Sequence, residues 1–378
     1  MTAIRRDDRT GRIGMVTPRY PPAMGGVEKH VEMIVRGLRE SGWEVEVLTT
    51  DPGGTLLPRA MRDGGPVRRF PTLRGDATFF LSPHLAWWLL LHGRRYDLIH
   101  GHSYHTPLAL VAAIAARLHG RPFVLTPYYH GTGHTPMRSR LHRPYRALGG
   151  WMVRQAVAVI CGSLAERDLV HRDFGDTVPT MVVSHGVTVE GFGSAAPFEL
   201  PGVTVLTGGR LEGYKQVDKV VLAMASLPAD HHLYVFGEGP ALPALEALVR
   251  ASPAAEHIHL LGRLPQDELH RWFRSADVFV SLSREESFGL TVIESAVAGA
   301  ALVMSDIPAY VEMCERLGTH PVEVVSVDAD PAEVAAAIRT VPKDRAARSA
   351  STVDVPTWEA VTEQVISAYR AAMDRARR

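Results

Sequence analysis

The stretch "VFVSLSREESFGLTVIESAVAGAALVMSD", residues 278–306, places two apolar, strand-like runs on either side of a helical segment. The first run ends at Ser283, a short polar loop follows, and a helical pattern opens at Phe288-Gly289. A second strand-like run, residues 301–306, comes directly after the helix. Two buried strands joined by a helix pair in parallel, with the helix on one face of the sheet. The stretch therefore predicts a βαβ unit of a doubly wound sheet.

The same alternation continues through the rest of the chain in two series. A break that lacks periodicity and is rich in glycine, proline and alanine separates them at residues 190–202. Before the break we expect a helix at 27–41 and strands at 12–18, 44–50, 97–102, 122–127, 158–161 and 181–186. After it we expect further strands at 203–210, 232–239 and 258–263. This rhythm predicts an α/β fold of two Rossmann-like doubly wound domains that face each other across a cleft.

The chain length of 378 residues also favours two domains over a single core. We place the N-terminal domain at residues 1–190, a linker at 191–202 and the C-terminal domain at 203–356. The last segment, 357–378, has the pattern of one amphipathic helix that begins near Trp358. We expect this helix to pack back on the N-terminal domain.

Two segments of the N-terminal domain carry predictions of their own. Residues 51–68 contain two Gly-Gly pairs and several arginines, so we expect a mobile surface loop there. Residues 79–91, "FFLSPHLAWWLLL", form the most apolar run, which is too short to span a bilayer. We interpret this run as a core helix. The alternative is an apolar surface that faces a lipid or a hydrophobic acceptor.

The composition excludes several classes of protein. The 41 basic and 41 acidic side chains give a formal net charge of zero, so no overall basic field exists to bind nucleic acid. Cys161 and Cys314 are the only cysteines, which excludes a disulfide framework and favours a reducing compartment. Residues 1–12 are polar and charged, and they lack the apolar centre of a signal peptide. We therefore expect a cytoplasmic protein.

Charged residues lie at the end of the strand expected at 203–210 in the second series and directly after it. Ligands of open parallel sheets bind beyond the carboxyl ends of the strands, so this is where a site is expected. In "TGGRLEGYK", residues 207–215, the glycines allow close backbone approach, and Arg210 and Lys215 can clamp a diphosphate. The alternative is an exposed turn with two solvated charges.

Two carboxylates flank the start of the helix in the opening stretch. Glu286 lies in the loop before it, and Glu294 lies about one and a half turns inside it. The free N–H groups at a helix amino terminus suit a phosphate, so two acids around it would flank a nucleoside diphosphate. The alternative is a capping acid and a solvated acid. Against that alternative, the neighbours of Glu294 are almost all small or apolar, and a carboxylate there needs a partner.

The segments "RYPPAMGGVEKHV", "GGRLEGYK" and "GRLPQDELHRWFRSADVFVSLSREESFGLTVIESAVAGAALV", together with the Trp358 helix, resemble the GT4 family of retaining glycosyltransferases in order and spacing. The resemblance covers nearly the whole chain, and the Glu-x7-Glu segment is its most specific part. It implies a GT-B fold, a UDP- or GDP-linked sugar donor, retention at the anomeric carbon and no required metal or other cofactor.

The resemblance also implies roles for individual residues. Arg210 and Lys215 would hold the donor phosphates, Glu286 the transferred sugar and Glu294 the ribose. Arg263 and Leu264 would meet the base through their backbone. The remaining donor contacts would come from two helix starts: Gly25, Gly26, Phe288, Gly289, Leu290 and Thr291.

The sequence departs from the family pattern in three places. His185-Gly186-Val187 stands where Asn-Gly-Val is usual, and "IPAYVE", residues 307–312, stands where many members have a Gly-Gly loop. Members often end a strand of the first domain with Thr-x-His, whose histidine lines the reaction centre. In "LTPYYHGTGH", residues 125–134, Tyr128 occupies that spacing and His130 follows two residues later. Either could face the donor sugar, and we favour His130 as a catalytic residue beside Arg210, Lys215 and Glu286.

Histidines and tyrosines cluster at two strand ends of the N-terminal domain. Alternation places His100 and His102 on the same side of a strand, as a metal site would require, but no carboxylate or cysteine lies near them in the sequence. We therefore expect no metal and favour acceptor recognition or a simple polar lining of the cleft. The residues predicted to bind the acceptor are Tyr104, His105, Tyr128, Tyr129 and His134.

Together these observations predict a metal-independent, retaining hexosyltransferase that moves a sugar from an NDP-sugar to a hydroxyl of a small or soluble acceptor. Arg94 and Arg95 are the only cations at the end of the apolar run 79–91, too few for firm membrane binding. A lipid-linked acceptor at the membrane surface is one alternative. An NDP-sugar epimerase or hydrolase with the same fold is another, and a catalytically silent sugar-nucleotide-binding protein is a third.

Overall fold

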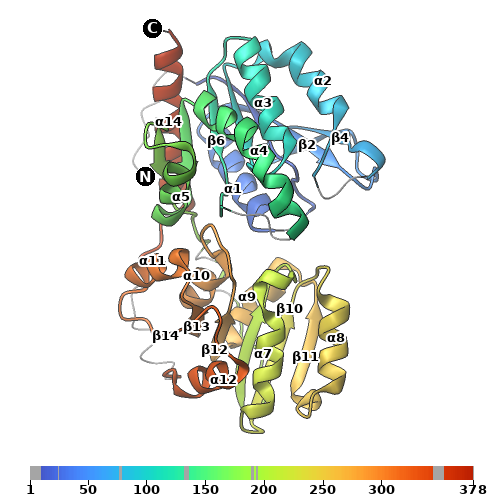
Figure 1. Cartoon of the computed structure of the whole chain (residues 1–378), viewed down its shortest axis with the longest axis vertical. Helices are drawn as coiled ribbons and strands as arrows, with labels where there is room; N and C mark the ends of the chain where they lie inside the picture. Colours follow the sequence, from blue (N-terminus) through green and yellow to red (C-terminus); the bar gives the residue numbers. More distant parts are fainter. Residues whose placement is uncertain are drawn as a thin grey trace. The chain divides into compact units, whose positions relative to one another are not determined.

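The computed structural model describes residues 10–23, 25–75, 79–131, 136–188, 191–192, 195–343 and 353–377. The chain divides into two compact units (Figure 1). The first unit comprises Met1–Gly186 together with Trp358–Arg378, and the second comprises Val187–Thr357. The C-terminal helix α14 (Trp358–Arg377) therefore belongs to the first unit, where it packs against α1 (Gly26–Glu40).

The described residues of the first unit contain an eight-stranded sheet with the order β3-β4-β2-β1-β5-β6-β7-β8. All neighbouring strands pair in parallel except β3 and β4. The predicted strands are confirmed as β1 (Arg12–Val16), β2 (Glu44–Asp51), β5 (Leu98–His102), β6 (Phe123–Thr126), β7 (Ala158–Cys161) and β8 (Thr180–Val182). The connecting helices are α1, α2 (Pro83–His92), α3 (Pro107–Leu118), α4 (Pro136–Gln155) and α5 (Leu164–Phe174).

Helices cover both faces of this sheet, and the side chains of each strand alternate between the two cores. Ile13 and Met15 of β1 pack under α1 and α14, whereas Val16 packs under α2 and α3. On α1, the residues spaced three and four apart that were predicted to form its apolar face are buried: Val31, Ile34, Val35 and Leu38. Their burial fixes α1 against the sheet. Because α1 follows β1 through a short loop, the start of the helix lies near the carboxyl end of β1.

The second unit has a six-stranded parallel sheet in its described part, with the order β11-β10-β9-β12-β13-β14. Its strands are β9 (Val203–Gly208), β10 (His231–Phe236), β11 (Ile258–Gly262), β12 (Val278–Ser281), β13 (Ala301–Ser305) and β14 (Val322–Val325). Of these, β14 escaped prediction because it is short and only half-buried. The order of the strands makes this a doubly wound sheet, as predicted.

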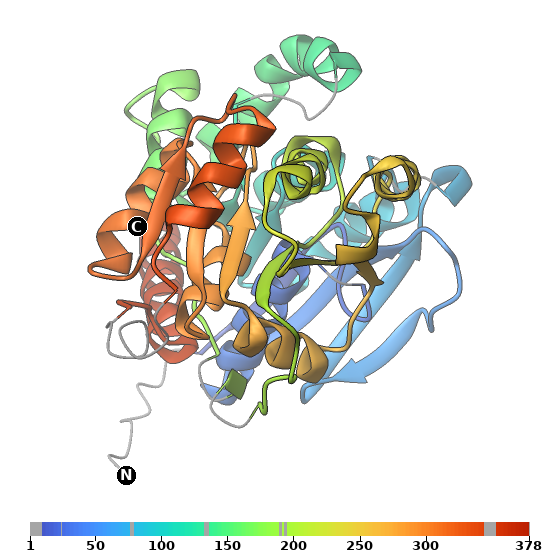
Figure 2. The same ribbon diagram turned by 90° about the horizontal axis from the view of Figure 1, so that it is seen from below.

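Two layers of helices cover the second sheet (Figures 1 and 2). The residues of β12 show the division, because Val278 and Val280 pack on one side and Phe279 packs on the other. The first layer contains α7 (Val217–Ala223), α8 (Leu242–Ala251) and α12 (Pro331–Thr340). The second contains α9 (Gln266–Ser275), α10 (Leu290–Val297) and α11 (Pro308–Leu317).

The prediction of a mobile loop at residues 51–68 is wrong. Strands β3 (Arg59–Arg62) and β4 (Gly65–Pro71) form an antiparallel hairpin in this region. The two turn residues, Asp63 and Gly64, have φ angles of 46° and 76°. A two-residue hairpin turn of type I′ requires positive φ at both positions, and Asp-Gly provides it at low cost. The Asp-Gly pair was therefore a hairpin signal.

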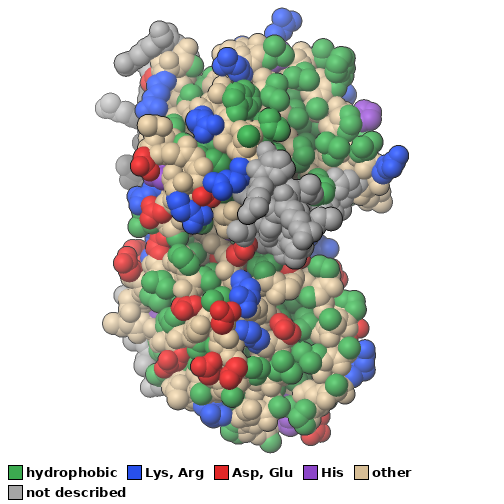
Figure 3. Space-filling view, viewed as in Figure 1, with side chains coloured by type: hydrophobic (Ala, Val, Ile, Leu, Met, Phe, Trp, Pro, Cys, Tyr) green, Lys and Arg blue, Asp and Glu red, His purple; other side chains and the backbone are tan. Residues whose placement is uncertain are grey.

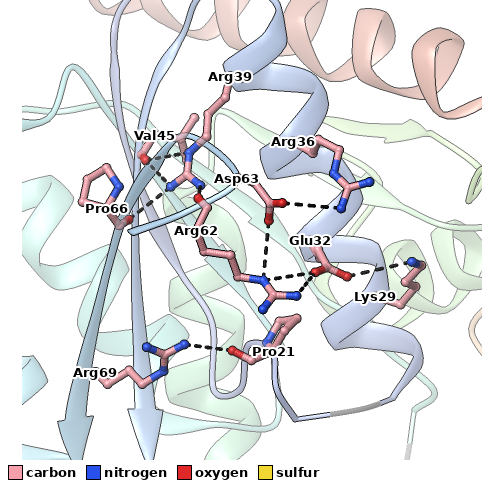
Figure 4. Close-up of polar contacts among 10 residues, drawn as sticks. All are labelled: Pro21, Lys29, Glu32, Arg36, Arg39, Val45, Arg62, Asp63, Pro66 and Arg69. Carbon is pink, nitrogen blue, oxygen red and sulfur yellow. Dashed lines mark hydrogen bonds and ion pairs between the residues drawn. The ribbon is translucent and has the colours of Figure 1, made fainter. Parts of the chain in front are cut away.

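Arginine contacts hold the hairpin against α1 (Figure 4). Arg62 donates to Glu32 on α1, with 2.6 Å between Nη2 and Oε1. Arg36, one turn further along α1, forms an ion pair of 3.5 Å with Asp63. Arg39 donates to the carbonyl oxygen of Arg62 at 2.5 Å. Residues from three successive turns of α1 thus contact the hairpin. These contacts hold the hairpin in the first unit, where the sequence had predicted a mobile loop.

The apolar run 79–91 was predicted to form a core helix. Helix α2 forms there, but only one of its sides is buried. Ser82 caps it by accepting a hydrogen bond from the Leu85 N–H at 3.3 Å, and Leu85 and Leu89 are fully buried. On the opposite side, however, Trp87 and Leu91 are 66% and 51% exposed. None of the helices in the described ranges combines the length and apolar character needed to cross a bilayer.

Candidate active site

The glycine-rich turn after β9 brings two cations to the carboxyl edge of the second sheet. Arg210 forms an ion pair with Glu212, with 3.1 Å between Nε and Oε1, and its side chain is 51% exposed. Lys215 lies in a single 3-10 turn, Gly213–Lys215, and the next residue, Gln216, adopts the left-handed conformation with a φ of 50°. The two predicted phosphate ligands therefore differ, since Arg210 lies in solvent and Lys215 points inward.

Lys215 forms an ion pair with Glu286, a residue 71 positions away in the chain. The ammonium group donates to Oε1 of the carboxylate, and the two side chains are only 17% and 16% exposed. Burial by itself lowers the pKa of Lys215, but the charge of Glu286, together with Tyr214 and Tyr310, outweighs burial and raises this pKa above its ordinary value. The lysine therefore stays protonated next to an acceptor oxygen.

Backbone contacts fix the loops that carry this ion pair. The Arg284 N–H donates to the carbonyl oxygen of Tyr214 at 2.8 Å. With its amide oriented to satisfy its neighbours, Gln216 donates to the carbonyl oxygen of Leu282 at 3.0 Å and accepts from Arg284 Nε at 2.6 Å. The turn after β9 and the loop after β12 are thus joined at several points, which holds Lys215 and Glu286 in register.

Helix α10 opens where the sequence predicted. Gly289 caps it in the left-handed conformation, with a φ of 95°, and Phe288 is buried in the core beneath. Leu290 and Thr291 start the helix and are partly exposed, and Glu294 is its fifth residue, also partly exposed. The first N–H groups of a helix have no partner inside the helix, so this terminus is suited to an anion.

The glycines at the ends of β9 and β10 allow the backbones of neighbouring strand ends to approach each other closely. The Gly209 N–H donates to the carbonyl oxygen of Phe236 at 3.1 Å, and the Gly237 N–H donates to that of Gly262 at 2.7 Å. Just beyond β11, Arg263 is exposed and Leu264 is buried. The predicted contact of these two residues with a base stays a prediction.

In the first unit, Gly25 and Gly26 lie at the exposed start of α1. A Cβ atom on Gly25 would overlap the carboxylate of Glu28, so a larger residue here would displace that side chain from the start of the helix. The preceding loop is anchored by Arg69 of β4, which donates to the carbonyl oxygen of Pro21 at 2.8 Å (Figure 4). The hairpin that the sequence did not predict therefore positions the predicted glycine loop.

The structure distinguishes Tyr128 from His130. Tyr128 adopts a left-handed backbone conformation with a φ of 47° and turns its ring into the first unit. Its hydroxyl group lies 2.6 Å from Nδ1 of His30 and 3.3 Å from Nδ1 of His102. His130 is partly exposed, and its ring stacks on that of His105 with 4.7 Å between the centroids. Of the two alternatives, only His130 presents a ring at the surface of the unit.

His100 and His102 lie side by side as predicted, but both serve as buried polar groups. His100 lies between the Tyr369 hydroxyl on α14, at 2.6 Å, and Thr126 Oγ1, at 2.9 Å. Burial lowers the pKa of His100 to about 3, so its ring is neutral. No group of three or more His, Cys, Asp or Glu side chains placed to hold a metal ion occurs in the described part of the chain.

Two of the predicted acceptor ligands are core residues instead. Tyr104 and Tyr129 are buried in the aromatic core of the first unit, where their ring centroids lie 4.9 Å apart. The Tyr129 hydroxyl donates to Asp173 at 2.6 Å. Their position after strands suggested a site, but their large apolar rings are better accommodated by burial. Tyr128 is buried in the same way, so His105 is the described acceptor candidate with surface exposure, and His134 lies outside the described residues.

Sequence reasoning missed the residues that support Glu286. Ser283 Oγ donates to Glu286 Oε1 at 3.0 Å, and the Tyr310 hydroxyl donates to the same oxygen at 3.3 Å. Ser283 was visible as the end of a predicted strand next to the acid. Tyr310 gave no signal, because it lies in the segment that departs from the family pattern and is distant in sequence.

Comparisons with known proteins agree with this geometry. Residues 24–190 match the family model described as Glycosyltransferase Family 4, and residues 197–352 match the model described as Glycosyl transferases group 1.

Similar proteins include the glycogen synthase of Mycobacterium tuberculosis, with 28% identity over 96% of this chain and 95% of that protein. They also include the GDP-mannose:cellobiosyl-diphosphopolyprenol alpha-mannosyltransferase of Komagataeibacter xylinus, with 25% identity over 100% of this chain and 97% of that protein. Among solved structures, sucrose-phosphate synthase from Thermosynechococcus elongatus matches with a TM-score of 0.83, at 19% identity over 97% of this chain and 100% of that one. The fold is therefore GT-B.

Proposed function

The chain belongs to the GT4 family of glycosyltransferases, and on this premise we propose that it transfers a hexosyl group from an NDP-sugar to a hydroxyl group with retention of configuration. The observation that carries the proposal is the buried Lys215–Glu286 pair beside the glycine-capped start of α10. A lysine, a carboxylate and free helix N–H groups at one sheet edge match a diphosphate linked to a sugar.

In this proposal the second unit binds the donor. Lys215 and the start of α10 hold the diphosphate, with Arg210 reaching it from the exposed turn. Glu286 accepts hydrogen bonds from the transferred sugar, and Glu294 accepts them from the ribose. The backbone at Arg263 and Leu264 meets the base, which belongs to a UDP- or GDP-linked donor.

Departure of the nucleoside diphosphate leaves negative charge on its phosphates and cation-like character on the sugar. The fixed cation of Lys215 and the helix dipole of α10 offset the growing negative charge. This is why we propose a metal-independent reaction. Glu286 Oε1 is already bonded to Lys215, so the carboxylate is placed to bind rather than to attack the sugar. We therefore favour same-face attack by the acceptor over a covalent glycosyl-enzyme intermediate.

For the acceptor, our first proposal is a small or soluble alcohol recognised by the first unit. His105 and His130 form the stacked pair that reaches the surface of that unit, where imidazole nitrogens can form a hydrogen bond with a hydroxyl group. A catalytic contact between His130 and the sugar is part of the same proposal.

A lipid-linked acceptor is the second candidate, and the exposed face of α2 and α3 favours it. Figure 3 shows hydrophobic side chains gathered over these helices. Trp87 and Leu91 of α2 and Leu118 of α3 are all more than half exposed, and Arg94 and Arg95 lie close to the end of α2. Aromatic and aliphatic groups next to arginines suit the interface of an anionic membrane.

The test is to incubate the protein with UDP- and GDP-hexoses and to measure nucleotide release with and without candidate acceptors. Release that requires an acceptor, with the anomeric configuration of the donor kept in the product by NMR, supports the proposal. Release without acceptor indicates a hydrolase, and an altered hexose still linked to its nucleotide indicates an epimerase. Failure to bind any of these nucleotides would indicate a different activity.

Sedimentation with anionic and neutral liposomes separates the two acceptor proposals. A small or soluble acceptor predicts that the protein stays in the supernatant at physiological salt. Co-sedimentation with anionic vesicles that is lost in the Trp87→Ser/Leu91→Ser variant would favour the lipid-linked acceptor.

A further inference from the structure

Glu286 is held by one of its two carboxylate oxygens. The Lys215 ammonium group, the Ser283 hydroxyl at 3.0 Å and the Tyr310 hydroxyl at 3.3 Å all donate to Oε1. Among the described residues, Oε2 takes part in none of these contacts. Three donors on one oxygen fix the plane and direction of a carboxylate, while the other oxygen keeps its lone pairs.

The donors are themselves fixed by further hydroxyl groups. Ser281 Oγ lies 2.7 Å from the Tyr310 hydroxyl, and either hydroxyl can be the donor; with the serine as donor, the tyrosine proton is directed to Glu286. Ser305 Oγ, at the end of β13, donates to the carbonyl oxygen of Ser283 at 2.6 Å. These hydroxyl groups come from the ends of β12 and β13 and from α11, so three elements of the sheet edge determine where Glu286 points.

Tyr310 also supports the start of α10. It is fully buried, and a Cβ atom added to Gly289 would lie only 2.6 Å from Cε1 of its ring. The ring thus packs directly under the left-handed glycine that caps the helix. One side chain therefore contacts both the proposed sugar ligand, through its hydroxyl, and the proposed phosphate-binding turn, through its ring.

We propose that Tyr310 and Ser283 are positioning residues that hold Glu286 by Oε1 and so present Oε2 to the hydroxyl groups of the transferred sugar. This inference rests on the proposed function, because it assigns a direction to the carboxylate that the donor sugar would meet. The hydroxyl of Tyr310 sets sugar selectivity and turnover, and its ring maintains the turn at Gly289.

Tyr310→Phe separates these two contributions, because it keeps the ring and removes the hydroxyl group. We expect kcat to fall about tenfold, as for the loss of one hydrogen bond to a charged group, with the NDP Kd and the Tm nearly unchanged. Selectivity between two donors that differ at one ring hydroxyl, such as UDP-glucose and UDP-galactose, should also fall. Ser283→Ala should act in the same direction. Tyr234→Phe, in the same core but packed against His259 and Trp272, is the matched control and should leave all these quantities unchanged.

A double-mutant cycle with Glu286→Gln tests whether Tyr310 acts through Glu286. If it does, adding Tyr310→Phe to Glu286→Gln changes kcat by less than about twofold. Multiplicative losses, or wild-type turnover and selectivity in Tyr310→Phe and Ser283→Ala, would overturn the inference while the proposed function stands. Failure of the wild type to bind or turn over any NDP-hexose, in contrast, would overturn the proposed function and the inference with it.

Discussion

The two units of this protein share one fold type but differ in the chemistry at the carboxyl ends of their strands. In the second unit these ends carry a charged pair, Lys215 and Glu286, among glycine turns. In the first unit, neutral rings take their place: His100 and His102 are buried and bonded to Tyr369 and Tyr128. The same position in a Rossmann-like sheet thus carries an ion pair in one unit and a neutral polar core in the other.

The difference follows from what each environment does to a titratable group. Burial disfavours a charge unless a partner of opposite charge offsets the loss of water, so the buried His100 and His102 of the first unit are neutral. Lys215 keeps its charge because Glu286 lies against it. A charge that is kept in a water-poor place is the feature that can act on a phosphate, whereas neutral buried rings mainly stabilise the fold.

The largest effect is expected from Lys215→Ala in the second unit. Loss of the fixed cation should lower kcat roughly a hundredfold or more, as removal of a preorganised charge or donor does in other enzymes. Steady-state kinetics with the best donor will measure it. Arg250→Ala, which removes an exposed cation on α8, should keep wild-type turnover. Substantial activity in Lys215→Ala would show that the fixed cation of the second unit is not needed for the reaction.

The next effect concerns Glu294 and the nucleotide alone. If Glu294 binds the ribose, Glu294→Ala should weaken the affinity for free NDP by about tenfold, or about 1.4 kcal/mol. Isothermal titration calorimetry is the measurement, and Glu246→Ala, an exposed acid on α8, is the control. Equal affinities in wild type and Glu294→Ala would remove the ribose assignment.

The first unit should be more sensitive to acid than the second, where burial lowers the pKa of the less buried His232 and His259. Burial lowers the pKa of His100 to about 3 and of His185 to about 4. Burial and neighbouring histidines lower the pKa of His30 and His102 as well. The unfolded chain therefore binds more protons than the folded one below pH 6.5 or so, and stability present above that pH is lost as the pH falls toward about 4. We expect a loss of a few kcal/mol.

Hydrogen exchange of peptides from each unit at pH 7.5 and pH 5 will locate this loss. Glu166 works in the opposite direction, because burial raises its pKa to about 7, so its contribution to stability falls as the pH rises from the ordinary carboxyl pKa toward about 7. Because one carboxyl group opposes four histidines, the histidines should determine how the stability of the first unit changes with pH. A His100→Asn variant should reduce the acid sensitivity, and His84→Asn, at an exposed position, should not. Equal acid sensitivity of both units would contradict the assignment.

The smallest effect is expected from a chelator. Because Lys215 and the start of α10 are proposed to offset the diphosphate charge, turnover should be unchanged in excess EDTA. Loss of activity that a divalent ion restores would show that a metal takes part. His100 and His102 would then have to leave their bonds with Tyr369, Thr126 and Tyr128 to act as ligands.

Much of the fold was accessible from the sequence because burial acts on local patterns. The apolar face of α1 and the buried runs that became β1, β9 and β12 repeat with helical or strand periods over a few residues. The start of α10 was accessible for the same reason, since a glycine before a helical run marks a cap. The hairpin β3–β4 was missed because its Asp-Gly turn was interpreted as a loop and its strands are half-exposed.

By itself, then, the sequence determined two α/β units, the strand ends that carry Arg210, Lys215, Glu286 and Glu294, and the class of ligand that such residues suit. Only the tertiary structure decided which side chains meet. Lys215 and Glu286 are 71 positions apart, and His100 and Tyr369 are 269 apart. The sequence was compatible with a Tyr128 side chain in the core or at the surface. The contacts of its hydroxyl with His30 and His102 show that it lies in the core. Contacts of this kind depend on the folded path of the chain, because no local periodicity encodes the partner of a polar group.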